Sequence, residues 1–211
     1  MKYKCIIFDC DGVLVDSEKI SSKILVDMAN ALGANINMDY AEHNFTGKSL
    51  NSVFLKIENL TAKKLPDNHE KVYRDQSFAM FKEKLQPIKG IHKLLDEISV
   101  PYCVASNGPV NKMVLNLSIA NLLDKFENRM FSAYQIKRWK PDPELFLHAA
   151  REMGFAPNEC VVIEDSIAGI KAACRGGFDV FGFANKLNSK EFEKEGATAF
   201  YEMESLLELL N

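Results

Sequence analysis

The chain has 211 residues, of which 47% are apolar and 26% are charged. This composition is typical of a folded globular protein and excludes disordered, collagen-like and membrane-embedded classes. The 26 basic and 29 acidic residues give a net charge of −3, which provides no general attraction to nucleic acid or to an anionic membrane surface. We therefore expect a protein without nucleic-acid or membrane partners.

The first apolar run of the chain ends in acidic residues. Residues 4–9 read KCIIFD, a pattern that predicts a short buried parallel strand with Asp9 at its C-terminal end. Asp9 and Asp11 also interrupt the apolar segment that follows Lys2 and Lys4, so this segment does not resemble an export signal. We expect a cytoplasmic protein.

The segment 16–86 has the periodicity of helices. Apolar residues recur every four positions from Ile20 to Leu32, and Gly33 follows as a helix stop. No convincing strand pattern occurs between there and Gln86. The sequence therefore predicts an all-helical insertion over 16–86, with residues 1–15 and 87–211 together forming a second domain.

Strand patterns resume after the helical segment. Apolar runs at 102–105 and 160–163 predict buried strands, and weaker candidates occur at 178–183 and 198–201. Helical patterns separate these runs, and alternation of this kind implies right-handed crossovers between parallel strands. We expect an α/β fold with a Rossmann-like, mainly parallel sheet flanked by helices.

Polar side chains follow several of the predicted strands. In parallel sheets, ligands bind beyond the C-terminal edge of the strands, so these side chains are expected to share one site. The candidate residues are Asp9, Asp11, Ser106, Asn107, Lys140, Glu164 and Asp165.

Each of these clusters also has a simpler explanation when it is taken alone. An Asp before Gly12 can cap a turn, Glu164 and Asp165 can cap the helix that starts near Ser166, and Lys140 can be a solvated surface lysine. Their convergence favours a functional site, because two carboxylates about 4 Å apart repel by roughly 4 kcal/mol at an effective dielectric constant near 20. A positive group or ion must lie among them, and oxygen ligands without clustered His or Cys favour Mg²⁺.

A magnesium site at this edge supports phosphoryl transfer. Asp9 can attack phosphorus and form an aspartyl phosphate, and Asp11 is placed to act as the general acid and base. The Ser106 hydroxyl, the Asn107 backbone and Lys140 are expected to stabilise the charge on the phosphate oxygens.

Four segments in this order resemble the motifs of the haloacid dehalogenase superfamily of phosphohydrolases. They are DCDGVLVDSE at 9–18, SN at 106–107, KPDPE at 140–144 and EDS at 164–166. The resemblance implies that 16–86 is the helical cap of that family, which closes over the site and excludes water. It also implies that Asp11 lends its backbone carbonyl to Mg²⁺, that Asp165 is a direct ligand, and that Glu164 assists around the ion.

The resemblance also suggests a substrate class. Residues 106–113 and 138–143 are similar to those of phosphatases that act on 6-phosphogluconate, so we expect a small phosphorylated metabolite, either a sugar phosphate or a sugar-acid phosphate. Gly47 and Lys48 are candidate substrate contacts in the cap, although a solvated lysine explains Lys48 equally well. Nothing in the sequence demands more than a monomer.

Two other enzymatic activities and a non-catalytic role are compatible with the same fold. A phosphosugar mutase of the β-phosphoglucomutase type carries a histidine and a phosphate-binding arginine in its cap, where this chain has Ser21 and Leu50. A dehalogenase needs neither metal nor the acid/base residue at the position of Asp11. A non-catalytic domain of this fold would have degenerate motifs, and none is degenerate here. We therefore expect a phosphatase, with the mutase as the main alternative.

Overall fold

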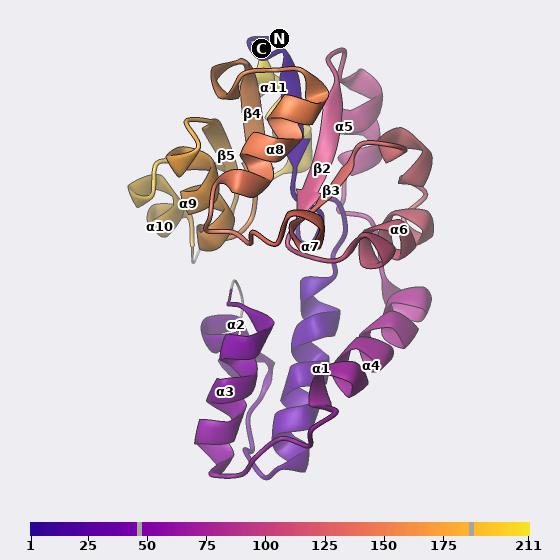
Figure 1. The fold of residues 1–211 in the computed structure, drawn as a ribbon, viewed down its shortest axis with the longest axis vertical. Coiled ribbons are helices and arrows are strands. Elements are labelled where there is room, and N and C mark those ends of the chain that lie inside the picture. The colour runs from indigo at the N-terminus through magenta and orange to yellow at the C-terminus, as the bar shows by residue number, and fades with distance from the viewer. Residues whose placement is uncertain (46–47, 186–187) are drawn as a thin grey trace. The chain divides into compact units, whose positions relative to one another are not determined.

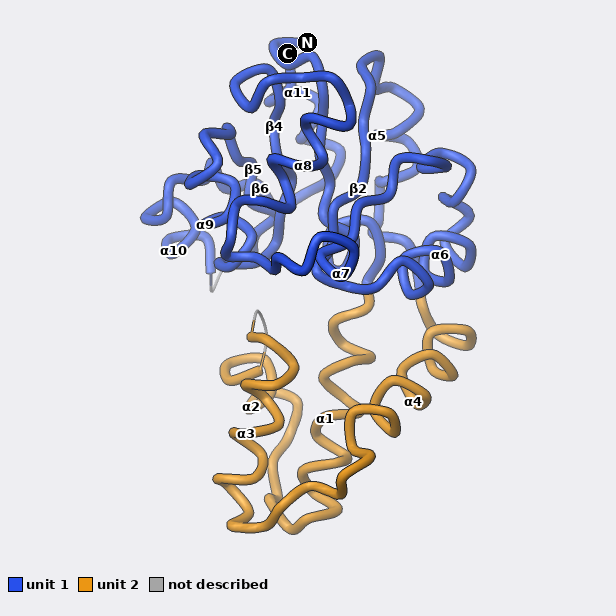
Figure 2. Tube along the Cα trace, viewed as in Figure 1, with its two compact units in different colours: residues 1–16, 86–211 blue, residues 17–85 orange. Residues whose placement is uncertain are grey.

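The computed structural model describes residues 1–45, 48–185 and 188–211. The chain forms two compact units, one made of Met1–Asp16 with Gln86–Asn211 and the other of Ser17–Leu85 (Figure 2). The boundaries lie one residue away from those expected from the sequence. The two units are described separately.

The first unit contains a parallel sheet with the strand order β3-β2-β1-β4-β5-β6 among the described residues. Figure 1 labels its strands β2, β3, β4 and β5. The strands are β1 (Cys5–Phe8), β2 (Tyr102–Ser106), β3 (Met130–Ser132), β4 (Cys160–Glu164), β5 (Asp179–Phe183) and β6 (Thr198–Phe200). Phe8 lies beside Val104 of β2 and Ile163 of β4, so these three strands end at nearly the same level. The Rossmann-like α/β fold predicted from the sequence is confirmed.

Helices connect the strands. They are α5 (Ile91–Glu97), α6 (Val110–Ile119), α7 (Ala133–Ile136), α8 (Glu144–Met153), α9 (Ile167–Arg175), α10 (Ser189–Lys194) and α11 (Leu206–Leu210). Local sequence sets their ends: the Ser166 side chain caps α9 by accepting a hydrogen bond from the Gly169 amide, and Gly154 ends α8 in the left-handed conformation. Within the described parts of the chain, no helix has both the length and the apolarity that crossing a membrane requires.

Both faces of the sheet are covered. On one face Cys5 and Ile7 of β1 belong to a buried cluster that includes Phe146 of α8 and Ile170 of α9. Side chains alternate between the two faces of a strand, and the intervening residue Ile6 is also fully buried. A sheet that is buried on both faces leaves the ends of its strands as the place where polar groups can gather.

The edge strand β3 was not predicted. It has only three residues, and Met130 and Phe131 are half-buried. A segment this short shows no measurable alternation, and it forms a strand because it pairs with Val104–Ser106 of β2. The tertiary neighbour therefore decides its conformation.

The described residues of the second unit form four helices and no strand, as predicted. The helices are α1 (Glu18–Ala31), α2 (Met38–Asn44), α3 (Leu50–Thr61) and α4 (His69–Lys84). This unit has its own core, in which Leu25 and Ala29 of α1 lie with Phe54 and Ile57 of α3. Of the residues that recur every four positions from Ile20 to Leu32, Met28 and Leu32 pack against this core.

Candidate active site

The site residues lie where the strand order changes direction. From β1 the chain proceeds to β2 and β3 on one side of the sheet, and it returns to place β4, β5 and β6 on the other side. Ligands bind at such a switch point in parallel sheets. Asp9 follows β1 directly, and Glu164 and Asp165 stand at the end of β4.

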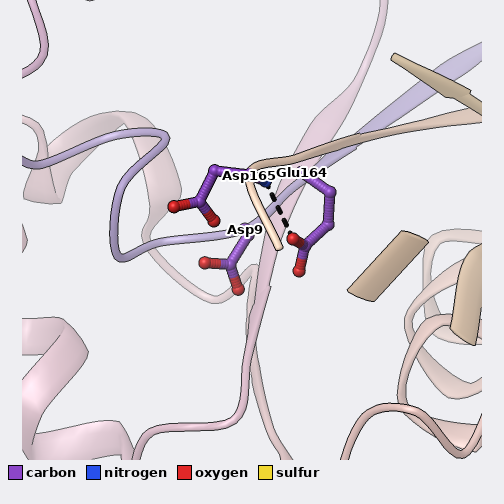
Figure 3. A group of neighbouring side chains, drawn as sticks. All are labelled: Asp9, Glu164 and Asp165. Atoms are coloured by element: carbon purple, nitrogen blue, oxygen red, sulfur yellow. Dashed lines mark hydrogen bonds between the residues drawn. The ribbon is translucent and has the colours of Figure 1, made fainter. Parts of the chain in front are cut away.

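Three carboxyl groups gather at this point. Asp9, Glu164 and Asp165 each offer a carboxylate oxygen within 4.8 Å of the others (Figure 3). Asp9 is 7% exposed and Glu164 is 1% exposed. The Asp9 amide donates to the Ile163 carbonyl at 2.9 Å, which ties the end of β1 to β4. The backbone therefore forces together acidic groups that would otherwise separate.

Lys140 lies between two of these acids. Its ammonium bonds Oδ1 of Asp9 and, at 2.7 Å, Oε1 of Glu164, and it lies 4.6 Å from the centre of the Phe146 ring. Burial by itself lowers the pKa of Lys140, but the Asp9 and Glu164 carboxylates outweigh this effect and raise the pKa above its ordinary value. Lys140 therefore carries a buried positive charge, and it is not a solvated surface lysine.

Asn107 holds the peptide of Lys140 in place. The Lys140 amide donates to Oδ1 of Asn107 at 2.9 Å, and Nδ2 of Asn107 donates to the Lys140 carbonyl at 3.5 Å. The side chain of Asn107 is thus committed to positioning Lys140, a role that the sequence did not indicate. Ser106 is buried, and its Oγ accepts a hydrogen bond from the Gly108 amide at 3.0 Å.

Protein donors surround the Glu164 carboxylate. Oε1 accepts a hydrogen bond from the Lys140 ammonium. Oε2 accepts hydrogen bonds from the Asp165 amide at 2.8 Å, the Ser166 amide at 2.7 Å and the Ser166 hydroxyl at 2.9 Å. The lack of a side chain at Gly169 makes room for it, because a Cβ there would lie 1.8 Å from Oε1. Glu164 therefore orients Lys140 and the turn after β4.

The charges of the site do not balance without a cation. If all four groups are ionised, the three carboxylates and the Lys140 ammonium leave a charge of −2. Burial raises the pKa of the Asp9 carboxyl, the Lys140 ammonium opposes this, and the charges of Glu164 and Asp11 raise the pKa further. A divalent cation would neutralise the cluster, and the all-oxygen donor set suits Mg²⁺. The residues present therefore fit the metal expected from the sequence.

Asp11 faces helix α6. Its Oδ2 accepts from Lys112 Nζ at 2.7 Å, and its Oδ1 accepts from Asn116 Nδ2 at 3.2 Å. Asn116 was not among the site residues predicted from the sequence. Asn116 is a polar residue among the buried residues of α6, whose other members are the apolar Met113 and Leu117.

The candidate substrate contacts belong to the second unit. Gly47 lies outside the described residues, and Lys48 is exposed. The Lys48 amide donates to the Phe45 carbonyl at the end of α2, which fixes its backbone but not its side chain. Their assignment as substrate contacts remains a prediction.

Known proteins are similar to this chain over nearly its whole length. A family model described as haloacid dehalogenase-like hydrolase matches residues 3–177. The chain is 36% identical to the 6-phosphogluconate phosphatase of Escherichia coli K12, over 99% of this chain and 95% of that protein. Among solved structures, it is similar to a haloacid dehalogenase-like protein of Agrobacterium tumefaciens C58, with 27% identity, a TM-score of 0.90 and coverage of 99% and 97% of the two chains.

A second solved structure bears on the alternative activity. It is a putative β-phosphoglucomutase of Thermotoga maritima, with 26% identity, a TM-score of 0.80 and coverage of 98% of both chains. The family match extends from before β1 to beyond α9 and so includes both Asp9 and Asp165. The chain therefore belongs to the haloacid dehalogenase-like hydrolases.

Proposed function

We propose that this chain is a Mg²⁺-dependent phosphatase that hydrolyses a sugar phosphate or a sugar-acid phosphate through an aspartyl phosphate on Asp9. The observation that carries the proposal is the buried cluster of Asp9, Glu164 and Asp165, whose charge Lys140 compensates only in part. Such a cluster favours binding of a divalent cation together with a phosphate group. Asp9 and Asp165 are the proposed direct ligands, with the Asp11 carbonyl as a further one.

The residues divide the reaction into two half-reactions. In the first, a carboxylate oxygen of Asp9 attacks phosphorus, the ester P–O bond breaks, and Asp11 gives its proton to the leaving oxygen. In the second, Asp11 takes a proton from water, the water oxygen bonds to phosphorus, and the Asp9 O–P bond breaks to release phosphate. Lys140 and the Ser106 hydroxyl offer positive charge and a hydrogen bond to the phosphoryl oxygens. Bound Mg²⁺ supplies Lewis acidity and charge neutralisation.

The substrate class is supported by the relative in E. coli, which is named as a 6-phosphogluconate phosphatase and aligns over nearly the whole chain. We place 6-phosphogluconate first among the candidates for this reason. A panel of phosphorylated sugars and sugar acids, ranked by kcat/KM, tests this assignment. A ranking led by phosphates that are neither sugars nor sugar acids would contradict it.

The mutase alternative has a structural neighbour in its favour, the putative β-phosphoglucomutase. A mutase must hold a second phosphate group, and Ser21 and Leu50 replace the cap histidine and arginine that would do so. We therefore expect water, and not a second sugar hydroxyl, to accept the phosphoryl group. A coupled assay for glucose 6-phosphate formed from β-glucose 1-phosphate is expected to be negative.

Metal removal gives a direct test of the proposal. Hydrolysis of p-nitrophenyl phosphate is expected to stop when EDTA is present in excess and to return when Mg²⁺ is restored, because the buried carboxylates repel the substrate phosphate without the cation. Phosphate release is measured beside p-nitrophenol release. Full turnover in EDTA would contradict the proposed role of the metal.

Gly12→Ala is expected to weaken Mg²⁺ binding about 10- to 100-fold. Gly12 has φ +82°, and a Cβ there would lie 1.8 Å from Oδ2 of Asp165, so the Asp165 carboxylate must move. Isothermal titration calorimetry with Mg²⁺ measures the change.

Gly154→Ala is the matched control for this variant. Gly154 has φ +83°, and no atom lies within 4 Å of the place that a Cβ would take there, so the substitution adds backbone strain without a clash. The backbone strain that the two variants share should cost each about 1–2 kcal/mol of stability, but only Gly12→Ala should lose Mg²⁺ affinity. Equal affinities for the two variants would contradict the assignment of Asp165 as a ligand.

A further inference from the structure

The Asp11 carboxylate is held by two donors from one helix. Lys112 Nζ donates to Oδ2 at 2.7 Å and Asn116 Nδ2 donates to Oδ1 at 3.2 Å. Residues four positions apart lie one above the other on the same face of a helix, so α6 presents both donors to one carboxylate. Each oxygen accepts a hydrogen bond, which fixes the plane of the carboxyl group as well as its position.

Asn116 is not explained by packing. It is 0% exposed, and its Oδ1 has no hydrogen-bond partner. An unpaired buried carbonyl oxygen destabilises a fold, and the neighbouring buried residues Met113 and Leu117 show that this position of α6 could hold an apolar side chain. Departures of this kind from the most stable choice are expected at functional sites.

Lys112 is not an ordinary surface lysine either. Its side chain is 20% exposed, and that of Asp11 is 24% exposed, so the pair is partly withdrawn from water. The long side chain crosses from α6 to the loop after β1, where its ammonium meets Oδ2 of Asp11.

We propose that Lys112 and Asn116 are positioning residues for Asp11, holding its carboxylate in the orientation that takes a proton from water during hydrolysis of the aspartyl phosphate. This inference rests on the proposed function. In the step concerned, a water O–H bond breaks and its proton passes to Asp11, the water oxygen bonds to phosphorus, and the Asp9 O–P bond breaks. A carboxylate with only one of the two donors can rotate about its Cβ–Cγ bond, which lowers the fraction in the productive orientation.

Kinetics with p-nitrophenyl phosphate can distinguish positioning of Asp11 from a general structural role of Lys112 and Asn116. Because p-nitrophenolate leaves without a proton, transfer to Asp9 does not need Asp11, whereas hydrolysis of the phosphoenzyme does. The value of kcat/KM reports only the steps up to release of p-nitrophenolate, and kcat also includes the hydrolysis. We expect Asn116→Leu and Lys112→Met to lower kcat about 10- to 100-fold while kcat/KM stays within about twofold of wild type.

Three further readouts accompany these constants. The variants should release p-nitrophenolate in a burst, whose amplitude counts the active enzyme, and should accumulate phosphoenzyme detectable by intact mass. Asn116→Leu should also unfold at a higher temperature than wild type, because it removes the unpaired oxygen and adds apolar contact. Lys112→Arg keeps a donor and should retain most of kcat.

The matched control is Ser118→Ala, at an exposed position of the same helix, which should leave both constants unchanged. Unchanged kcat in Asn116→Leu and Lys112→Met would overturn the inference, and so would kcat and kcat/KM that fall together at an undiminished active-enzyme count. If the wild-type enzyme shows no Mg²⁺-dependent turnover, the proposed function fails and the inference fails with it.

Discussion

Asp9→Asn is expected to lower Mg²⁺-dependent turnover of p-nitrophenyl phosphate by about 10⁴-fold or more. An amide at this position cannot attack phosphorus, so the covalent route is closed. Acid-quenched wild-type enzyme should carry a phosphoryl group detectable by intact mass, and the variant should carry none. The measurement is kcat/KM at saturating Mg²⁺ together with the mass of the quenched protein.

The loss of activity in Asp9→Asn should not come from unfolding. Burial already disfavours the charged form of Asp9, and Lys140 keeps its second partner Glu164 at 2.7 Å, so the variant should be at least as stable as wild type. Asp124→Asn, at an exposed position of the same unit, is the control and should retain full activity. Turnover by purified Asp9→Asn above one-tenth of the wild-type rate would refute the assigned nucleophile.

Lys140→Met is expected to reduce both stability and catalysis. Removing the buried Lys140 ammonium leaves the Asp9 and Glu164 carboxylates without the positive charge that both contact. Breaking a buried ion pair in this way costs about 3–5 kcal/mol of stability. Losing one group that stabilises charge on the phosphoryl oxygens should lower kcat a further 10²- to 10³-fold, approximately. Urea unfolding in EDTA gives the first quantity, and steady-state kinetics at saturating Mg²⁺ gives the second.

Lys140→Met should also change the pH dependence of Mg²⁺ binding. Burial raises the pKa of Asp9 and Lys140 opposes this rise, so without Lys140 the pKa of Asp9 moves higher still. Asp9 then stays protonated up to a higher pH, and Mg²⁺ binding, which needs the carboxylate, should begin at a higher pH than in wild type. Lys190→Met, at an exposed position of α10, should leave both the stability and the pH profile unchanged. A Lys140→Met protein as stable as wild type would show that the charges of the site do not depend on this lysine.

The sheet was largely predictable because its central strands are continuous apolar runs. β1, β2 and β4 are buried along almost their whole length, and a run of this kind between turn residues indicates a buried parallel strand. β3 could not be predicted, since its three residues become a strand only through pairing with β2. The strand order could not be predicted either, because it depends on which strands pair in space.

The grouping of the acids with Lys140 was predictable from the sequence, but their contacts, and the contacts of Lys112 and Asn116 with Asp11, were not. Asp9, Lys140 and Glu164 are more than 20 residues apart from one another in sequence, and their grouping followed from the rule that parallel strands end at one edge. The sequence did not show that the Glu164 oxygens are engaged by Lys140 and the turn after β4, nor that the Asn107 side chain holds Lys140. Such contacts depend on side-chain directions that spacing does not determine.

The central claim is that the Asp9 and Asp165 carboxylates bind one divalent cation. The most direct test is to soak a crystal of the wild-type protein with Mn²⁺ and to locate the ion by anomalous diffraction. We predict one strong peak bound by the carboxylates of both Asp9 and Asp165, close to the Lys140 ammonium but not in contact with it. A peak that touches neither carboxylate, or a fully occupied ion bound elsewhere while this cluster binds none, would contradict the central claim.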